Sequence, residues 1–170
     1  MKTLLRQSNI ARLAFLALFI SAFAACEKSV PGDDSSQPYN INVTLRPEMG
    51  KDKPGGGFGF VKFRQDPDTA RIITLDTWVV NLLPDHDYQL QRAVNPITDA
   101  DCTSTTWLTL GEGLVAKSIH TDAHGNGQAD LFRDVTTVAR GTEFHIHFQI
   151  IDAVSLATVL TSDCYQYTVR

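Results

Sequence analysis

The chain has 170 residues, of which 43% are hydrophobic, and its formal net charge is −4 at pH 7. An acidic chain is a poor electrostatic partner for nucleic acid and for anionic lipid, so we expect neither as a ligand. This length fits a single domain that buries enough surface to fold without a structural metal.

The first 25 residues have the features of an export signal. Three basic residues precede an apolar run at 13–25, which only Ser21 interrupts. A basic start, a short apolar run and small residues before a cleavage point are typical of a secretory signal peptide. The run is shorter than the roughly 20 residues of a membrane-spanning helix. Removal of residues 1–25 would change the net charge from −4 to −7, because it takes away three basic residues and no acidic one.

Cys26 follows this run directly, in the sequence Phe23-Ala24-Ala25-Cys26. The pattern resembles the lipobox of bacterial lipoproteins, with Phe23 where Leu is usual. The resemblance implies that Cys26 is lipidated and anchors the chain in a membrane; cleavage of an ordinary signal peptide after Ala25 is the alternative. In this family an aspartate after the cysteine tends to retain proteins at the inner membrane. Glu27 stands there instead, which implies the outer membrane, on either of its sides.

Residues 26–38 are polar, contain Pro, Gly and Ser, and lack apolar periodicity. This composition predicts a flexible tether, so we expect the folded domain to occupy residues 39–170. Alternation of apolar and polar side chains predicts a first strand at 39–45. Residues 47–57 are glycine-rich but lead into a strand at 58–64, which indicates a hairpin connection and not a phosphate-binding loop. A long strand is expected at 71–83.

The next segment, Leu82-Leu83-Pro84-Asp85-His86-Asp87-Tyr88, resembles the corner that precedes the penultimate strand in fibronectin type III and related immunoglobulin-like domains. In that family a tyrosine hydroxyl bonds back to the backbone of the corner. The resemblance implies that Leu82, Pro84 and Tyr88 form a tyrosine corner. It also implies a sandwich architecture, although more chain follows this corner than in a fibronectin domain.

Further strands are expected in the second half of the chain. Residues 115–132 read as a hairpin around Asn126-Gly127, a strong turn signal. Strands follow at 142–152 and 158–169, and in the first of these Phe144, Ile146, Phe148 and Ile150 share one face. Short strands separated by turns predict an all-β fold, a single immunoglobulin-like antiparallel β-sandwich of about seven to nine strands.

With Cys26 lipidated, Cys102 and Cys164 remain. Two cysteines in an exported chain predict one disulfide, because that compartment is oxidising. Two free thiols, or a metal site shared with histidines, are the alternatives.

His145 and His147 lie two apart on one strand, so both imidazoles point to the same face. Zinc and copper sites on β-sheets use this spacing, with further ligands from elsewhere. His120 and His124 are the candidates for a third ligand. The alternative is that these histidines are polar residues on a solvent-facing strand.

The sequence contains no recognisable catalytic motif. We therefore expect a non-enzymatic envelope lipoprotein without a cofactor, held to the membrane by its lipid, whose β-sandwich binds a protein, peptide or glycan or serves a structural role. A zinc- or copper-binding protein centred on His145 and His147 is the second hypothesis, and an envelope hydrolase is a weaker third.

Overall fold

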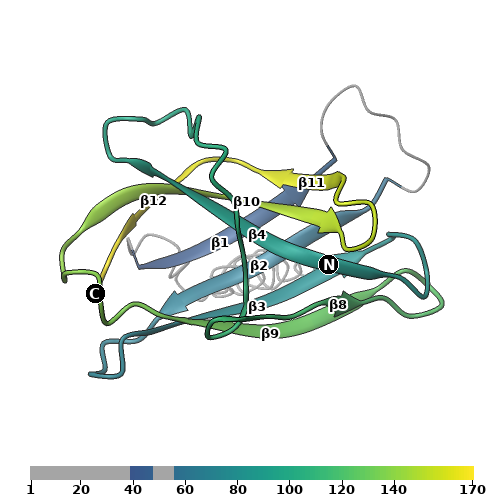
Figure 1. Cartoon of the computed structure of the whole chain (residues 1–170), viewed down its shortest axis with the longest axis horizontal. Coiled ribbons are helices and arrows are strands. Elements are labelled where there is room, and N and C mark those ends of the chain that lie inside the picture. The colour runs from purple at the N-terminus through teal and green to yellow at the C-terminus, as the bar shows by residue number, and fades with distance from the viewer. Residues whose placement is uncertain (1–38, 48–55) are drawn as a thin grey trace, which may run out of the picture. The chain divides into compact units, whose positions relative to one another are not determined.

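The computed structural model describes residues 39–47 and 56–170. The predicted signal peptide, the lipidation site Cys26 and the tether lie outside these residues, as does most of the glycine-rich segment. The described residues form twelve β-strands and no helix, which confirms the all-β class (Figure 1). The described residues contain no helix that is long and apolar enough to cross a membrane.

The strands differ widely in length. Eight of them have four to ten residues, and the four strands from β5 to β8 have two residues each. Their bounds are β1 Asn40–Arg46, β2 Phe58–Gln65, β3 Ile72–Val80, β4 Asp87–Pro96, β5 Leu108–Thr109, β6 Gly111–Glu112, β7 Val115–Ala116, β8 Ile119–His120, β9 Gly127–Asp134, β10 Glu143–Asp152, β11 Thr158–Ser162 and β12 Tyr165–Thr168.

All twelve strands belong to one hydrogen-bonded sheet with the central order β4-β10-β11-β1-β2-β3-β9. In Figure 1, β4 and β10 cross in front of β1, β2 and β3, so the sheet curls over on itself. The result is one nearly closed, barrel-like sheet, in which the two separate sheets of the expected sandwich are not distinguished. The count of twelve also exceeds the expected seven to nine, because the two-residue strands are too short to show periodicity.

The segment Leu108–Glu112 joins the two edges of the curled sheet. Its first half, β5, pairs with β4, while its second half, β6, runs parallel to β9. The Leu110 amide donates to the Leu90 carbonyl at 2.8 Å. Gly111 is required here, because an added Cβ would lie 1.9 Å from the Val115 carbonyl oxygen. A short crossing strand therefore closes most of the gap that an open sheet would leave.

The predicted core face of β10 is confirmed. Ile146, Phe148 and Ile150 are buried, at 2% exposure or less. The Phe63 ring of β2 lies 6.1 Å from the Phe148 ring and 4.9 Å from the Tyr167 ring of β12. Such edge-to-face pairs add to the burial of apolar area, so they hold β2 against β10 and β12 across the interior.

Two predicted elements differ from the structure. In the expected hairpin at 115–132, β8 pairs with β4, and it meets β9 through the single bridge Thr121–Gly127. The expected last strand at 158–169 is divided into β11 and β12, which pair with successive parts of β10. At the division the Phe148 amide donates to the Ser162 hydroxyl at 2.9 Å, so this amide keeps a partner where β11 turns away.

Candidate functional site

The turn between β3 and β4 forms the corner that the sequence predicts. The Tyr88 hydroxyl accepts a hydrogen bond from the Leu83 amide at 3.0 Å, and Tyr88 itself is buried. Burial raises the pKa of Tyr88 above its usual value, so the phenol keeps its proton. Asn81 and Asp85 in this turn have positive φ, a conformation that short polar residues adopt more readily than others.

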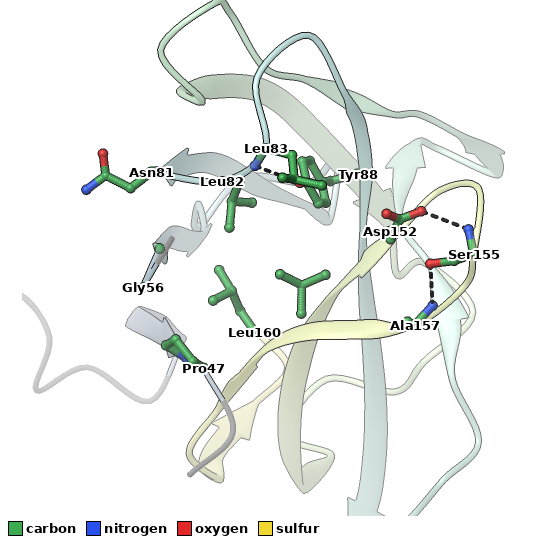
Figure 2. A pocket seen from close by; sticks show the side chains of 12 residues that line it. Pro47, Gly56, Asn81, Leu82, Leu83, Tyr88, Asp152, Ser155, Ala157 and Leu160 are labelled. Carbon is green, nitrogen blue, oxygen red and sulfur yellow. Dashed lines mark hydrogen bonds between the residues drawn. The ribbon is translucent and has the colours of Figure 1, made fainter. Parts of the chain in front are cut away.

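This corner forms one wall of a pocket of about 200 Å³, which we call the corner pocket. Figure 2 shows the side chains of Leu82 and Leu160 directed into it from opposite sides, with Tyr88 behind Leu83. Six residues provide most of its apolar lining: Leu82, Leu83, Tyr88, Ala157, Val159 and Leu160. The pocket lies where β1, β3 and β10 end and where β2, β4 and β11 begin.

Asp152 supplies the charge beside the corner pocket. Its carboxylate accepts hydrogen bonds from the amides of Val154 and Ser155, both at 2.8 Å. Its second oxygen lies 2.7 Å from the Nε2 of His86. The Ser155 amide first, and then the Val154 amide and the His86 ring, lower the pKa of Asp152 to about 2. These contacts hold the β10–β11 turn against the corner and leave the carboxylate engaged.

Three apolar side chains in the β3–β4 and β10–β11 turns at this end are exposed to solvent. Leu83 is 56% exposed, Val154 81% and Leu156 68%, and we call this set the apolar rim. Leu156 also has a φ of 59°, a left-handed conformation that costs a residue with a Cβ about 1–2 kcal/mol. Strained backbone and exposed apolar side chains both concentrate at functional surfaces. The apolar rim was not predicted from the sequence, because isolated apolar residues in a turn carry no periodicity.

The structure places His145 and His147 on one face of β10, as predicted, but that face does not point to open solvent. The Trp107 ring lies 4.7 Å from the His147 ring, and His147 Nε2 donates to the Ser104 carbonyl at 3.2 Å. Burial lowers the pKa of His147. His145 Nδ1 is buried and has no hydrogen-bond partner within the described residues.

The other two candidate ligands lie elsewhere. His120 is opposite Asp87 at the start of β4 and contacts its carboxylate at 2.9 Å, whereas His145 is opposite Asn95 near the end of β4. At about 3.3 Å per residue, these positions are roughly 25 Å apart. His124 is exposed in the turn before β9. Across the described residues, no group of three or more His, Cys, Asp or Glu side chains is placed to hold a metal.

The predicted disulfide is present. Cys102 and Cys164 are bonded, with their Cα atoms 5.7 Å apart. The bond ties the segment 97–107 to the turn between β11 and β12. In the same segment, Asp99 accepts hydrogen bonds from the Thr103 amide and hydroxyl and contacts the side chain of Asn95. These bonds hold the segment over the face of β10 that carries both histidines.

A second pocket, of about 240 Å³, lies at the opposite end of the sheet. It contains two residues that the sequence analysis missed, Arg92 and Arg133, so we call it the arginine pocket. A signal for Arg92 exists in the sequence: it continues the alternation of Tyr88 and Leu90, which are both buried core residues. An arginine in register with a core face is directed inward unless the strand twists it out.

Comparison with models of protein families, with curated proteins and with solved structures finds no match to this chain.

Proposed function

We propose that this chain is a non-enzymatic lipoprotein of the cell envelope, anchored through Cys26 in the outer membrane, whose β domain binds a protein partner at the corner pocket. The lipobox-like sequence at 23–26 supports the anchor. The observation that carries the binding site is the juxtaposition of an apolar pocket with the exposed apolar rim.

The chemistry of this end favours a protein or peptide over a glycan. Tight protein interfaces bury apolar side chains in pockets that other apolar contacts shield from water. The corner pocket receives such a side chain, and the rim residues Leu83, Val154 and Leu156 provide the shield. Glycan binding favours exposed aromatic platforms, whereas the aromatic ring in this pocket, Tyr88, is 2% exposed.

The direction of β1 supports this choice of surface. β1 begins at Asn40, which pairs with Arg64 at the end of β2, and it runs toward Pro47 at the corner pocket. The first described strand thus begins at the end of the sheet opposite the corner pocket. A partner at the corner pocket approaches without passing the point where the tether joins.

We also propose that the β domain is related to immunoglobulin-like domains. The bond from the Leu83 amide to the Tyr88 hydroxyl supports it, because this bond is what a tyrosine corner requires.

Photo-crosslinking in intact cells tests the partner site. A photoreactive amino acid is placed at Val154, 81% exposed on the rim, and as the matched control at Leu114, 85% exposed in the turn between β6 and β7. We expect a discrete, protease-sensitive adduct from position 154 and none from position 114. Equal adducts at both positions, none at 154, or an adduct to glycan or lipid would overturn the proposed site.

Separately, Cys26→Ser should move the chain out of the membrane fraction, and unchanged fractionation would refute the anchor.

Zinc or copper binding at His145 and His147 is the second candidate function. The unpartnered, buried Nδ1 of His145 favours it. Against it, the hydrogen bond to Ser104 uses the Nε2 of His147. The geometry therefore supports the first function better.

A further inference from the structure

The arginine pocket lies at the end of the sheet where β2 and β9 end and where β3 and β10 begin. Its walls are largely apolar and aromatic, with the side chains of Phe63, Phe144 and Tyr167 among them. The Phe144 and Tyr167 rings are 5.1 Å apart, and Tyr167 is fully buried. An apolar space of this kind needs no charged residue to be stable, so its two arginines require an explanation.

Arg92 carries a charge into this space without a partner. It is half-buried on the face of β4 that holds Tyr88 and Leu90, and its neighbours across the ladder are Phe148 and Leu108. Within residues 39–47 and 56–170, its guanidinium makes no hydrogen bond and no ion pair. Burial, and then the charge of Arg133, lower the pKa of Arg92. The Arg92 nitrogens are not fully buried, so the guanidinium keeps contact with solvent at the pocket and its N–H donors have unused binding capacity.

Arg133 approaches the same pocket from β9. One of its terminal nitrogens donates to the Gly113 carbonyl at 3.1 Å, which leaves further N–H donors of the planar fork. Asp134 also lines the pocket, but it is exposed, and its carboxylate accepts the Thr136 amide at 2.7 Å. It forms no ion pair with either arginine in the described part of the chain. The pocket therefore has a net positive charge.

We propose that the arginine pocket binds a small amphipathic anion, with its carboxylate on Arg92 and Arg133 and its apolar body against Val138 and Phe144, which are both partly exposed. An arginine fork matches the planar geometry of a carboxylate and donates to both of its oxygens. The bound charge also relieves the repulsion between the two guanidinium groups. This site is separate from the corner pocket and does not depend on the protein partner proposed there.

The volume limits the size of the ligand. About 240 Å³ corresponds to roughly eight water molecules at ~30 Å³ each. A carboxylic acid with a short aliphatic chain or a single ring fits this space, whereas a full phospholipid does not. The apolar walls exclude a bare inorganic anion as the best ligand, because such an ion would lose its hydration without gaining apolar contacts.

An NMR titration tests the proposal with three probes: octanoate, octanol and inorganic phosphate. The protein is the exported chain from residue 26 onward, oxidised, with Cys26→Ser to remove the lipid. A hydrogen bond to a charged group contributes about tenfold or more in affinity. We therefore expect octanoate to bind at least tenfold more tightly than octanol and than phosphate, with shifts at Val138 and Phe144, which line the pocket.

Variants locate the effect. Arg92→Gln should remove the preference for octanoate over octanol, and Arg133→Gln should reduce it. Arg140→Gln, an exposed arginine that is not part of the pocket lining, is the matched control and should retain it. Equal affinity of the wild-type chain for octanoate and octanol, tighter binding of phosphate, or an unchanged preference in Arg92→Gln would overturn the proposal. The comparison of octanoate with octanol and phosphate on the chain with wild-type arginines tests the proposal even if a variant fails to fold.

Discussion

The hydroxyl of buried Tyr88 accepts a hydrogen bond from the Leu83 amide at 3.0 Å. Leu83 itself is 56% exposed on the other side of the same turn. One residue thus has its backbone held by the core and its side chain presented to solvent. The turn is hydrogen-bonded to β4 through Tyr88 and presents an apolar side chain to solvent. That combination suits a surface that binds a partner without first being ordered.

Tyr88→Phe removes the acceptor and leaves the Leu83 amide without its partner. A net hydrogen bond contributes about 0.5–1.5 kcal/mol, so we expect a loss of about 1 kcal/mol in the free energy of unfolding. Chemical denaturation measures this loss. Tyr165→Phe is the control, because the Tyr165 hydroxyl accepts the Thr44 amide at a longer 3.3 Å. A larger loss in the control would contradict the importance of the corner.

The corner and the β10 core face were predictable because each has a local signature. Leu82, Pro84 and Tyr88 form a spaced motif, and period-two alternation marks strands such as β1 and β10, each with one face in the core. The pairing of the two-residue strands from β5 to β8 was not predictable, because it depends on where long loops return to the sheet. Arg92 was missed because composition assigns an arginine to the surface, although its alternation with Tyr88 and Leu90 places it on their face of β4.

The disulfide was predicted from the cellular compartment, but its consequence for the histidines was not. It holds the segment 97–107 over β10, so a face that reads as polar and open is in fact covered. The double variant Cys102→Ser/Cys164→Ser should destabilise the domain by up to about 4 kcal/mol, since the two cysteines are 62 residues apart.

A second measurement separates loosening of the covering segment from global loss of stability. Burial lowers the pKa of His147, so release of this segment should raise that pKa toward its ordinary value. NMR titration of the histidine rings in the folded double variant gives the answer. An unchanged His147 pKa would show that Trp107 and Ser104 hold the cover without the disulfide.

Asp152 predicts a specific loss of stability in acid. Its pKa is depressed to about 2 in the folded state, below the ordinary value of 3.8. A depressed pKa stabilises the fold above the unfolded value, and this stabilisation is lost as pH falls from about 4 toward 2. At 1.36 kcal/mol per pKa unit the contribution is about 2 kcal/mol. Asp152→Asn should lower the free energy of unfolding by most of this contribution at pH 7 and by little at pH 2. Asp130→Asn, which removes an exposed carboxylate on β9, is the control.

Replacing Leu156 should raise the stability of the domain and weaken partner binding. Its φ of 59° penalises any residue with a Cβ, so Leu156→Gly should stabilise the domain by up to about 1 kcal/mol after the entropy cost of glycine. The same change removes a rim side chain and should weaken the cross-link from position 154. Leu114→Gly is the counterpart: Leu114 is also exposed, at 85%, but lacks a positive φ, so glycine there should destabilise the domain and leave the cross-link intact. A Leu156→Gly chain that cross-links like the wild type would remove this residue from the partner surface.

Metal content separates the two candidate functions. Zinc at His147 Nε2 would have to displace the Ser104 carbonyl, and the described residues provide no group of three ligands for a metal. We therefore expect the purified chain, equilibrated with micromolar zinc or copper, to hold well under one equivalent by elemental analysis. The contrary result would be one equivalent that His145→Ala/His147→Ala abolishes and His120→Ala/His124→Ala retains. Such a site would use the free Nδ1 of His145 and would make metal binding the function of this covered face.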